Sequence, residues 1–357
     1  MVGLVRDAEK IARLRRQLLA WYACNRRDLP WRRSRDPYAI WVSEIMLQQT
    51  RVAVVVERYQ TFLARFPTLL SLAAASEQDV LALWSGLGYY RRARMMLKAA
   101  RFIAEQRLTG LPASSAALRK LPGIGVYTAA AIASIAFGEA VAVVDGNVER
   151  VLCRLEGWEF AEGASESALK REIHLLAAQL LDPAQPGDFN QATMELGATV
   201  CLPRNPRCLV CPLAADCRTK GEHATAPRAP MLSREGAHAL SIRTRRAGQQ
   251  VLLEQRPSSL TVMPGLWQLP ELKQTEVPGH LLRMTVRHAI MQVNYYVRIR
   301  NVYEDELKSL TVAGGARRWV SLAEAAAMAL TGLTRKVLTR AHLFEVRPRE
   351  PLNESQS

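Results

Sequence analysis

Apolar residues recur at the spacing of amphipathic helices from Ala8 to about Ala215. Near the start, Ile11, Leu14, Leu18 and Tyr22 fall on one face of a helix. The same period predicts further helices at 43–64, 77–84, 91–107, 115–121, 127–137, 146–155, 166–181 and 189–199. Proline and glycine residues at 36–37, 66–67, 110–112, 122–123 and 183–187 separate these runs, as expected of loops. This part of the chain is therefore predicted to be mainly α-helical.

The pattern changes after residue 217. Residues 218–235 contain Gly221, Pro227 and Pro230 but little periodicity, which indicates an interdomain linker. Beyond it, β-forming residues cluster at 251–253, 284–286, 293–299 and 319–320, and helical patterns follow at 321–330 and 334–342. We therefore expect a helical domain over 1–217, a small α+β domain over 236–346 and a disordered polar tail over 347–357.

Basic residues outnumber acidic ones by a wide margin. The chain carries 48 Lys and Arg against 33 Asp and Glu, a formal net charge of +15 and a sequence pI near 10.0. Most of the excess is arginine, which matches phosphate geometry, so the charge favours a nucleic-acid partner over a set of solvated helix faces. The longest apolar stretch, 129–144, is interrupted by polar residues. It is shorter than the roughly 20 residues that span a bilayer, so no membrane partner is expected.

Cysteines form an array of the type C-x6-C-x2-C-x5-C at Cys201, Cys208, Cys211 and Cys217. Four thiolates suit either an iron–sulfur cluster or Zn²⁺. Zinc sites usually contain two short C-x2-C pairs, and only one is present here, so the spacing favours a [4Fe–4S] cluster over zinc or plain thiols. Disulfides are not expected, because Cys24 and Cys153 lie far apart and no secretory segment opens the chain, which indicates a reducing cytosolic compartment.

A glycine-rich turn and an aspartate precede the cysteines. The turn Leu121–Gly125 lies between two helical runs, where Gly123 and Gly125 leave backbone N–H groups open to a phosphate, although such turns are often plain loops. About twenty residues later, an apolar run ends in Asp145, with Asn147 close behind it.

In this order, the turn, the aspartate and the cysteine array resemble the helix-hairpin-helix DNA glycosylases of the endonuclease III superfamily. The resemblance covers residues 10–220. It implies a six-helix barrel, an iron–sulfur cluster subdomain and one [4Fe–4S] cluster per chain. Members that also cleave the strand carry a lysine where this chain has Tyr127. Because a phenol cannot form a Schiff base with the sugar, the resemblance implies a monofunctional enzyme.

Residues 29–50 resemble the hallmark segment of the adenine DNA glycosylases of the MutY type, and Glu44 is its key residue. Read alone, Glu44 is an ordinary helical glutamate, but Val42, Ile45 and Met46 surround it with apolar groups that would raise its pKa. The resemblance implies that Glu44 protonates the adenine and then activates water. It implies that Asp145 stabilises the sugar cation or bonds to the sugar transiently, and that Asn147 positions either Glu44 or Asp145.

The same resemblance implies two groups of binding residues. The pocket for the extruded adenine would consist of Arg27, Trp31, Arg32, Leu47, Tyr127 and Glu195. The side chains that wedge into the DNA would be Gln49, Thr50, Leu87 and Tyr89. For Tyr89 and Tyr90 a buried aromatic pair is an equally good interpretation.

Segments 265–271 and 319–324 resemble the Nudix-like C-terminal domain of these glycosylases, without the paired glutamates of a catalytic Nudix helix. In the family this domain recognises 8-oxoguanine through a Phe-Ser-His motif. Aligning His288 with the preceding histidine of the family puts Ile290, Met291 and Gln292 at the motif, so the usual recognition of the lesion is in doubt.

Taken together, the residues and the resemblance predict a monomeric, cytoplasmic and nucleoid-associated DNA glycosylase of base excision repair. Its substrate would be double-stranded DNA carrying adenine opposite 8-oxoguanine or guanine. Two alternatives are a mismatch or oxidised-pyrimidine glycosylase of the same superfamily and a DNA-damage sensor without catalysis.

Overall fold

The computed structural model describes residues 7–158, 166–222, 230–290, 292–306 and 315–344. These residues form two compact units. Unit 1 comprises 1–49, 62–73 and 98–227, and unit 2 comprises 50–61, 74–97 and 228–357. Among the described residues, no helix is long and apolar enough to cross a membrane.

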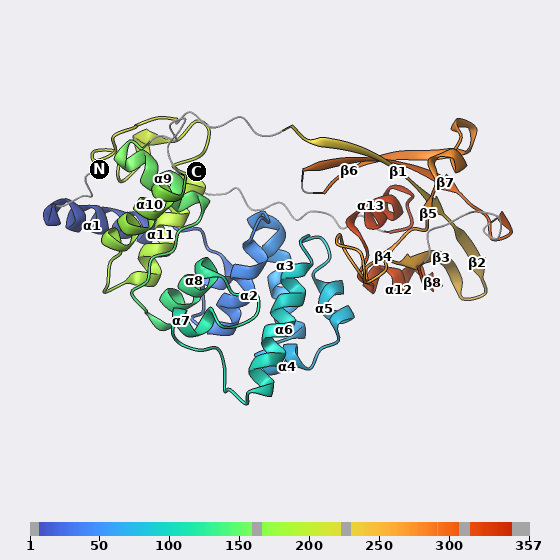
Figure 1. Ribbon diagram of the computed structural model, residues 1–357, viewed down its shortest axis with the longest axis horizontal. Coiled ribbons are helices and arrows are strands. Elements are labelled where there is room, and N and C mark those ends of the chain that lie inside the picture. The colour runs from blue at the N-terminus through green and yellow to red at the C-terminus, as the bar shows by residue number, and fades with distance from the viewer. Residues whose placement is uncertain (1–6, 159–165, 223–229, 291, 307–314, 345–357) are drawn as a thin grey trace. The chain divides into compact units, whose positions relative to one another are not determined.

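Unit 1 is helical, as predicted (Figure 1). Its helices are α1 (Ala8–Asn25), α2 (Pro37–Leu47), α4 (Leu69–Ala73), α7 (Ser115–Leu118), α8 (Val126–Phe137), α9 (Gly146–Glu156), α10 (Glu166–Leu180) and α11 (Pro186–Thr199). Short 3-10 helices at Pro30–Arg32 and Cys208–Val210 complete it. Helices α3 (Val52–Arg65) and α6 (Arg91–Glu105) each contribute residues to both units, whereas α5 (Glu77–Leu83) belongs to unit 2.

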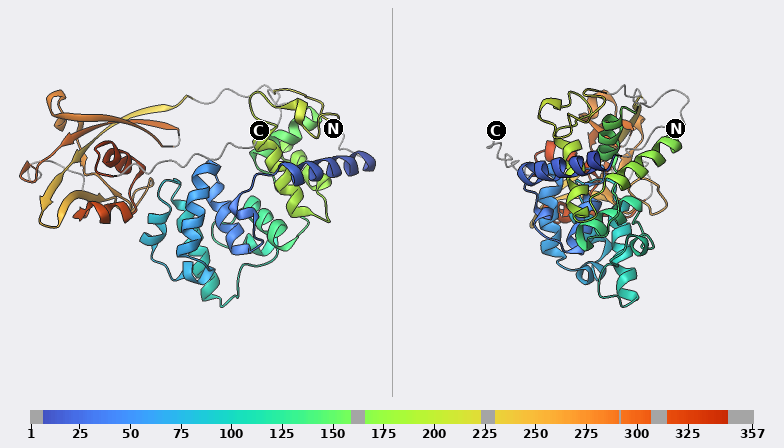
Figure 2. Two further views of the ribbon diagram at one scale, coloured as in Figure 1. Left: turned by 180° about the vertical axis from the view of Figure 1, so that it is seen from behind. Right: turned by 90° about the vertical axis from the view of Figure 1, so that its left-hand side faces the viewer.

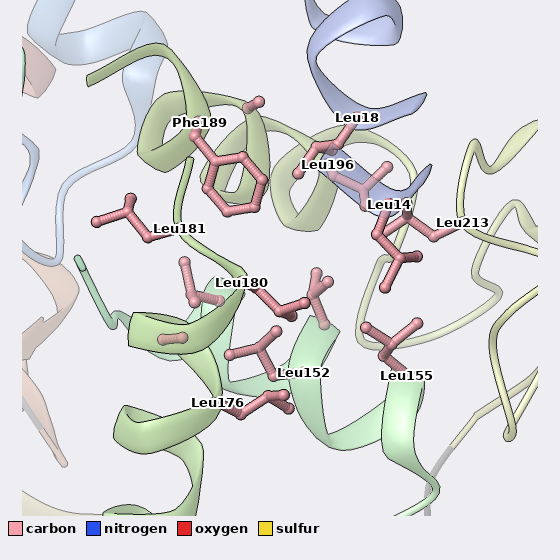
Figure 3. Packing of buried hydrophobic residues seen from close by; sticks show 14 of the residues in the cluster. Leu14, Leu18, Leu152, Leu155, Leu176, Leu180, Leu181, Phe189, Leu196 and Leu213 are labelled. Carbon is pink, nitrogen blue, oxygen red and sulfur yellow. The ribbon is translucent and has the colours of Figure 1, made fainter. Parts of the chain in front are cut away.

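Helices α1, α9, α10 and α11 bury one apolar core. Leu14 and Leu18 of α1 meet Leu152 of α9, Leu176 of α10 and Phe189 of α11 in this core (Figure 3). Each of these side chains is less than a tenth exposed. The helical spacing of apolar residues in the sequence predicts such a contact surface, and its burial stabilises unit 1 through the hydrophobic effect.

One predicted helix was wrong. The run 43–64 is divided into α2 and α3, because the chain leaves the helical conformation after Leu47 and resumes it at Val52. Gln49 between them has a left-handed φ of 55°. No glycine or proline marks this break, and the four polar residues at 48–51 are its only trace in the sequence.

The C-terminal part of unit 2 is α+β, as predicted. One sheet has the order β5-β1-β7-β6, and the other contains β2, β3, β4 and β8. The strands are β1 (Leu232–Leu240), β2 (Ile242–Arg245), β3 (Gly248–Gln255), β4 (Trp267–Gln268), β5 (Glu271–Leu272), β6 (Leu282–Ile290), β7 (Val293–Asn301) and β8 (Arg317–Ser321). The pair β1–β7 is parallel, and the other strand pairs are antiparallel.

Two helices, α12 (Leu322–Ala327) and α13 (Gly332–Arg340), complete this region. Helix α13 contacts β4 of one sheet and β6 of the other, and both sheets are visible from behind in Figure 2. Its Val337 and Leu338 are buried with Val251 of β3 and Val286 of β6. The apolar core of the region therefore includes both sheets and α13.

Both ends of the segment 218–235, which is predicted to be a linker, form backbone hydrogen bonds. The backbone N–H groups of Arg218 and Thr219 donate to the carbonyls of Leu155 and Arg154, and β1 already begins at Leu232. Backbone hydrogen bonds fix both ends. Such bonds do not require a pattern of apolar side chains, so no sign of them appears in the sequence. Residues 223–229 and the predicted tail 347–357 lie outside the described residues, and the proposed division into domains stays a prediction.

Candidate active site

Glu44 lies in a buried position on α2. The N-terminus of this helix is capped, because the Asp36 side chain accepts a hydrogen bond from Tyr38 N. Pro37 occupies the first turn, where its missing N–H group costs no hydrogen bond. Glu44 is only 6% exposed. Burial raises the pKa of Glu44 to about 7, and the charge of Asp145 raises it further, whereas Tyr127 and Arg32 act against the shift. The raised pKa that its apolar neighbours predicted is therefore present.

Tyr127, in the first turn of α8, is the hydrogen-bond partner of Glu44. Its hydroxyl donates to Glu44 Oε2 over 2.8 Å and lies 3.5 Å from Met194 Sδ. Burial and the nearby carboxylates raise the pKa of Tyr127 well above its usual range. The phenol therefore keeps its proton and remains a donor toward Glu44.

Asp145 caps the N-terminus of α9. Its Oδ1 accepts from the backbone N–H groups of Asn147 and Val148 over 2.9 and 2.8 Å. Its Oδ2 accepts from Asn147 Nδ2 over 2.9 Å. Both oxygens are thus held in fixed directions at the start of a helix, which suits a carboxylate that must face a developing positive charge.

Arg150 fixes Asn147 from the opposite side. Its Nη2 donates to Asn147 Oδ1 over 2.8 Å and to the Gly197 carbonyl over 2.7 Å, and its Nε donates to the Cys201 carbonyl over 2.8 Å. Sequence reasoning missed Arg150. Its spacing of three residues from Asn147 on one helix was the available signal, because such pairs share a helix face.

Three predicted pocket residues form an ion cluster around the buried carboxylate of Glu195. Arg27 Nε and Nη2 donate to Glu195 over 2.7 and 2.8 Å, and Arg32 Nη2 donates to the same carboxylate over 2.7 Å. Burial acts to raise the pKa of Glu195, but the hydrogen bonds from Arg27 and Arg32 outweigh it and lower the pKa to about 2. Glu195 is therefore ionised at neutral pH. Trp31 is buried in the intervening 3-10 helix, and Leu47 is half-buried at the end of α2.

The glycine-rich turn has the predicted hairpin geometry. Gly123 has a left-handed φ of 78°, and Ile124 N closes the turn on the Leu121 carbonyl over 3.2 Å. Gly125 is the N-cap of α8 and is exposed. A Cβ at Gly125 would meet nothing within 4 Å, so the start of α8 is open on this side.

The four predicted metal ligands line one pocket with Arg154 and Leu213. Burial raises the pKa of the Cys211 thiol to about 11, and the nearness of Cys201, Cys217 and Cys208 adds to the increase. Within the described ranges, no group of three or more His, Cys, Asp or Glu side chains is arranged to hold a metal ion. The donor set would nevertheless suit an iron–sulfur cluster, because four cysteine thiolates hold such clusters in proteins.

The predicted DNA-facing residues are distributed over several segments. Gln49 is exposed in the break between α2 and α3. Thr50 Oγ1 donates to the Leu87 carbonyl over 3.2 Å, so these two lie together. Leu87 is buried at 3% exposure, whereas Tyr89 is 43% exposed. Of Leu87 and Tyr89, only Tyr89 therefore has a side chain that is accessible to a ligand.

The aligned lesion-recognition residues lie at the hairpin that joins β6 and β7. His288 is half-buried on β6, where burial lowers its pKa and the charge of Lys336 lowers it further. Ile290 ends β6, and the Gln292 carbonyl accepts from Leu232 N over 2.9 Å. Met291 lies outside the described residues.

Residues 42–175 match the family described as HhH-GPD superfamily base excision DNA repair protein. The human adenine DNA glycosylase is 49% identical over 226 residues, which cover 61% of this chain and 41% of that protein. The adenine DNA glycosylase of Buchnera aphidicola subsp. Schizaphis graminum is 39% identical over 201 residues, which cover 56% of this chain and 57% of that protein. The chain thus spans about half the length of these curated relatives.

Two solved structures resemble the helical part. A thermostable thymine-DNA glycosylase has a TM-score of 0.54 and 29% identity, and the match covers 60% of this chain and 99% of that protein. A non-covalent endonuclease III–DNA complex has a TM-score of 0.50 at 22% identity, covering 59% of this chain and 95% of that chain, which shows the fold alone. Residues 42–175 therefore match the HhH-GPD superfamily of base excision DNA repair proteins, and the curated relatives to which the chain is similar are adenine DNA glycosylases.

Proposed function

We propose that this protein is an adenine DNA glycosylase, which hydrolyses the N-glycosidic bond of adenine opposite 8-oxoguanine or guanine in double-stranded DNA. The observation that carries the proposal is the buried Glu44, whose pKa is raised to about 7 and which accepts a hydrogen bond from Tyr127. A carboxyl group in this state is protonated in a large share of molecules at neutral pH and is suited to act as an acid.

In the proposed reaction the adenine first leaves the base stack. The carboxyl group of Glu44 gives its proton to a ring nitrogen of the base, and the bond between that base and the sugar breaks with its electron pair moving to the base. Protonation makes adenine a better leaving group, which is the role of the acid in glycoside hydrolysis.

Asp145 then faces the positive charge that develops on the sugar. The hydrogen bonds from Asn147 and Val148 fix its carboxylate, so it does not need to reorganise during the reaction. Water adds to the sugar carbon, and the carboxylate of Glu44 accepts the proton that the water loses. This step restores Glu44 to its protonated state.

The protein is proposed to be monofunctional. Tyr127 is the residue at the position of the strand-cleaving lysine, and its hydroxyl is already engaged by Glu44. A phenol offers no amine for an imine with the sugar. We expect an intact abasic strand that breaks only after alkali, and no covalent product on treatment with borohydride; efficient trapping of the protein on DNA would contradict this.

Cys201, Cys208, Cys211 and Cys217 are proposed to hold one [4Fe–4S] cluster with a structural role. Support comes from their common pocket and from the spacing of the array. Iron and sulfide analysis of the purified protein tests this, and stoichiometric zinc without iron would contradict it.

The α+β region is proposed to be Nudix-like and to contribute to recognition of the base opposite the adenine. In the sequence, Ile290 and Met291 offer only apolar contact and Gln292 a flexible amide, where the family has Phe, Ser and His. We therefore expect a weaker preference for A:8-oxoguanine over A:G than in the family. The loss of base-edge contacts should reduce the difference in binding free energy by about 1–3 kcal/mol.

A single-turnover assay tests the proposed function. Duplexes carrying A:8-oxoguanine, A:G, A:C and T:G pairs are compared, each with and without alkali. Release of adenine from the first two supports the proposal. Release of thymine from T:G alone would favour a mismatch glycosylase, and binding without base release from any duplex would favour a damage sensor.

A further inference from the structure

The turn that carries Tyr89 has an unusual backbone. It joins α5 to α6, and three of its residues have left-handed φ angles: 96° for Gly86, 70° for Gly88 and 46° for Tyr89. A tyrosine rarely adopts such a conformation, so contacts around the turn must stabilise it.

The middle of the turn is held by Trp84, which follows α5, and by Arg92, which lies at the start of α6. Arg92 Nη2 donates to the Leu87 carbonyl over 3.0 Å, and Trp84 Nε1 donates to the Gly88 carbonyl over 3.1 Å. The Arg92 guanidinium also lies 5.4 Å from the centre of the Tyr89 ring. These contacts hold Leu87 and Gly88, and at the ends of the turn Ser85 N donates to the Ala82 carbonyl and the Ser85 and Tyr90 side chains are hydrogen-bond partners.

Both ends of the turn are held by the C-terminal region, which lies in the same compact unit. At one end, Arg335 Nε of α13 donates to Ser85 Oγ over 3.1 Å. At the other end, the Tyr90 hydroxyl donates to the Leu330 carbonyl over 3.1 Å. Ser85 is 2% exposed and Tyr90 is 5% exposed, so water competes little with either bond.

The acceptor for Tyr90 is itself well fixed. Leu330 forms a backbone bridge with Trp267 of β4, and Thr331 N donates to the Trp267 carbonyl over 2.9 Å. The hydroxyl of Tyr90 is therefore anchored to a sheet and not to a loose segment. A change in the α+β region would reach the turn through this contact.

We propose that the α+β region sets the conformation of the turn 85–90, and that Tyr90 and Arg335 are positioning residues for Tyr89. The inference rests on the proposed function for the role of Tyr89 at the DNA. It adds a second contribution of the C-terminal region, which is independent of any contact between that region and the opposite base.

The first test is hydrogen exchange of the free protein, which needs no substrate. Tyr90→Phe removes only the hydroxyl, and Arg335→Gln removes the bond to Ser85. Each should speed exchange of the amides in 85–92 roughly fivefold, in line with the net effect of one hydrogen bond. Amides of α8 and α9 should keep their rates.

Matched controls are Tyr303→Phe, which removes a hydroxyl from a residue that is 69% exposed, and Arg340→Gln at the exposed end of α13. Neither should alter exchange in 85–92. Unchanged exchange there in both Tyr90→Phe and Arg335→Gln would overturn the inference, whether or not the protein proves to be a glycosylase.

The second test asks whether the effect passes through Tyr89. In single-turnover assays, Tyr90→Phe should slow base release from A:8-oxoguanine and A:G duplexes by the same factor, roughly three- to tenfold, because the proposed role of Tyr89 is to wedge into the DNA whichever base lies opposite. In a Tyr89→Ala background, Tyr90→Phe should have no further effect. Additive losses, or faster exchange without slower base release, would overturn the positioning role.

Discussion

Glu44 and Glu195, two of the buried glutamates of unit 1, show how the same side chain is prepared for different tasks. Glu44 and Glu195 are 6% and 1% exposed, and burial acts to raise the pKa of both. Yet the pKa of Glu44 rises to about 7, whereas that of Glu195 falls to about 2. The difference therefore comes from the partners and not from burial.

The partners of the two carboxyl groups differ in charge. Glu195 accepts from two guanidinium groups, which stabilise only its ionised form. Glu44 accepts from one neutral phenol and lies near the negative charge of Asp145. Glu195 is thereby a fixed anion that orients Arg27 and Arg32, and Glu44 remains able to gain and lose a proton near neutral pH.

The largest effect is expected for Glu44→Gln. The amide keeps the shape of the side chain but has no transferable proton, so base release should fall by about 10²–10⁴-fold, the contribution of a positioned general acid. DNA binding should remain within about threefold of the unchanged protein. Single-turnover base release and binding to an A:G duplex measure the two quantities, and near-normal adenine release would remove Glu44 from the reaction.

Glu195→Gln should instead act mainly on stability. It leaves the charges of Arg27 and Arg32 without their partner, and Arg32 is only 11% exposed. Removing one member of a buried pair costs about 3–5 kcal/mol. Because the Arg27 side chain is 40% exposed, we expect a loss of about 2–3 kcal/mol in the free energy of unfolding.

Denaturant unfolding checks the effect of Glu195→Gln. Asp28→Asn is its control, since it breaks a neighbouring ion pair with Arg33 whose side chains are 74% and 63% exposed, and it should leave stability unchanged. Equal losses in both variants would mean that the buried cluster is no more important than a surface pair.

The environment of Glu44 could be predicted from the sequence, but that of Glu195 could not. The apolar residues around Glu44 lie within one helix turn of it, so they are close to it in the sequence. Their pattern therefore predicts a buried carboxyl group. The contacts of Glu195 join residues about 165 positions apart, and no pattern within α11 contains them. Resemblance to a family placed Arg27 and Arg32 in the pocket, but only the structure gives their bonds to Glu195.

The fold shows the same limit. Helices of unit 1 followed the apolar period, whereas the break at Gln49 was missed because it depends on one left-handed residue without glycine or proline. Strand β1 was missed; its residues 232–235 are exposed, and the strand pairs with β7 through the backbone. Backbone conformation and backbone pairing leave little trace in the order of side chains.

A third prediction concerns stability as a function of pH. Glu44 has a folded pKa near 7 against an ordinary value of 4.5, so the unfolded chain releases this proton first as the pH rises. Its contribution should therefore lower the free energy of unfolding by about 2 kcal/mol between pH 4.5 and 7. Glu195 should act in the opposite window, with stability lost as the pH falls from 4.5 toward 2.

Unfolding of the DNA-free protein at a series of pH values separates the two groups. Relative to the unchanged protein, Glu44→Gln should lose the decline between pH 4.5 and 7 and keep the decline at acidic pH. Glu195→Gln should show the reverse. If Glu44→Gln leaves the profile between pH 4.5 and 7 unaltered, its carboxyl group does not titrate there.

The smallest expected effect is that of Tyr127→Phe on the pH dependence of base release. The phenol donates to Glu44 and so lowers the pKa of that carboxyl group, against the larger effect of burial. Its loss should raise the pKa of Glu44 further and extend base release to higher pH, because a larger share of Glu44 keeps its proton there. The single-turnover rate at a series of pH values measures the alkaline limb, and Tyr303→Phe serves as the control for loss of an exposed hydroxyl. A limb that moves to lower pH would mean that the phenol stabilises the protonated form of Glu44, and the contrast between a neutral partner for Glu44 and charged partners for Glu195 would have to be revised.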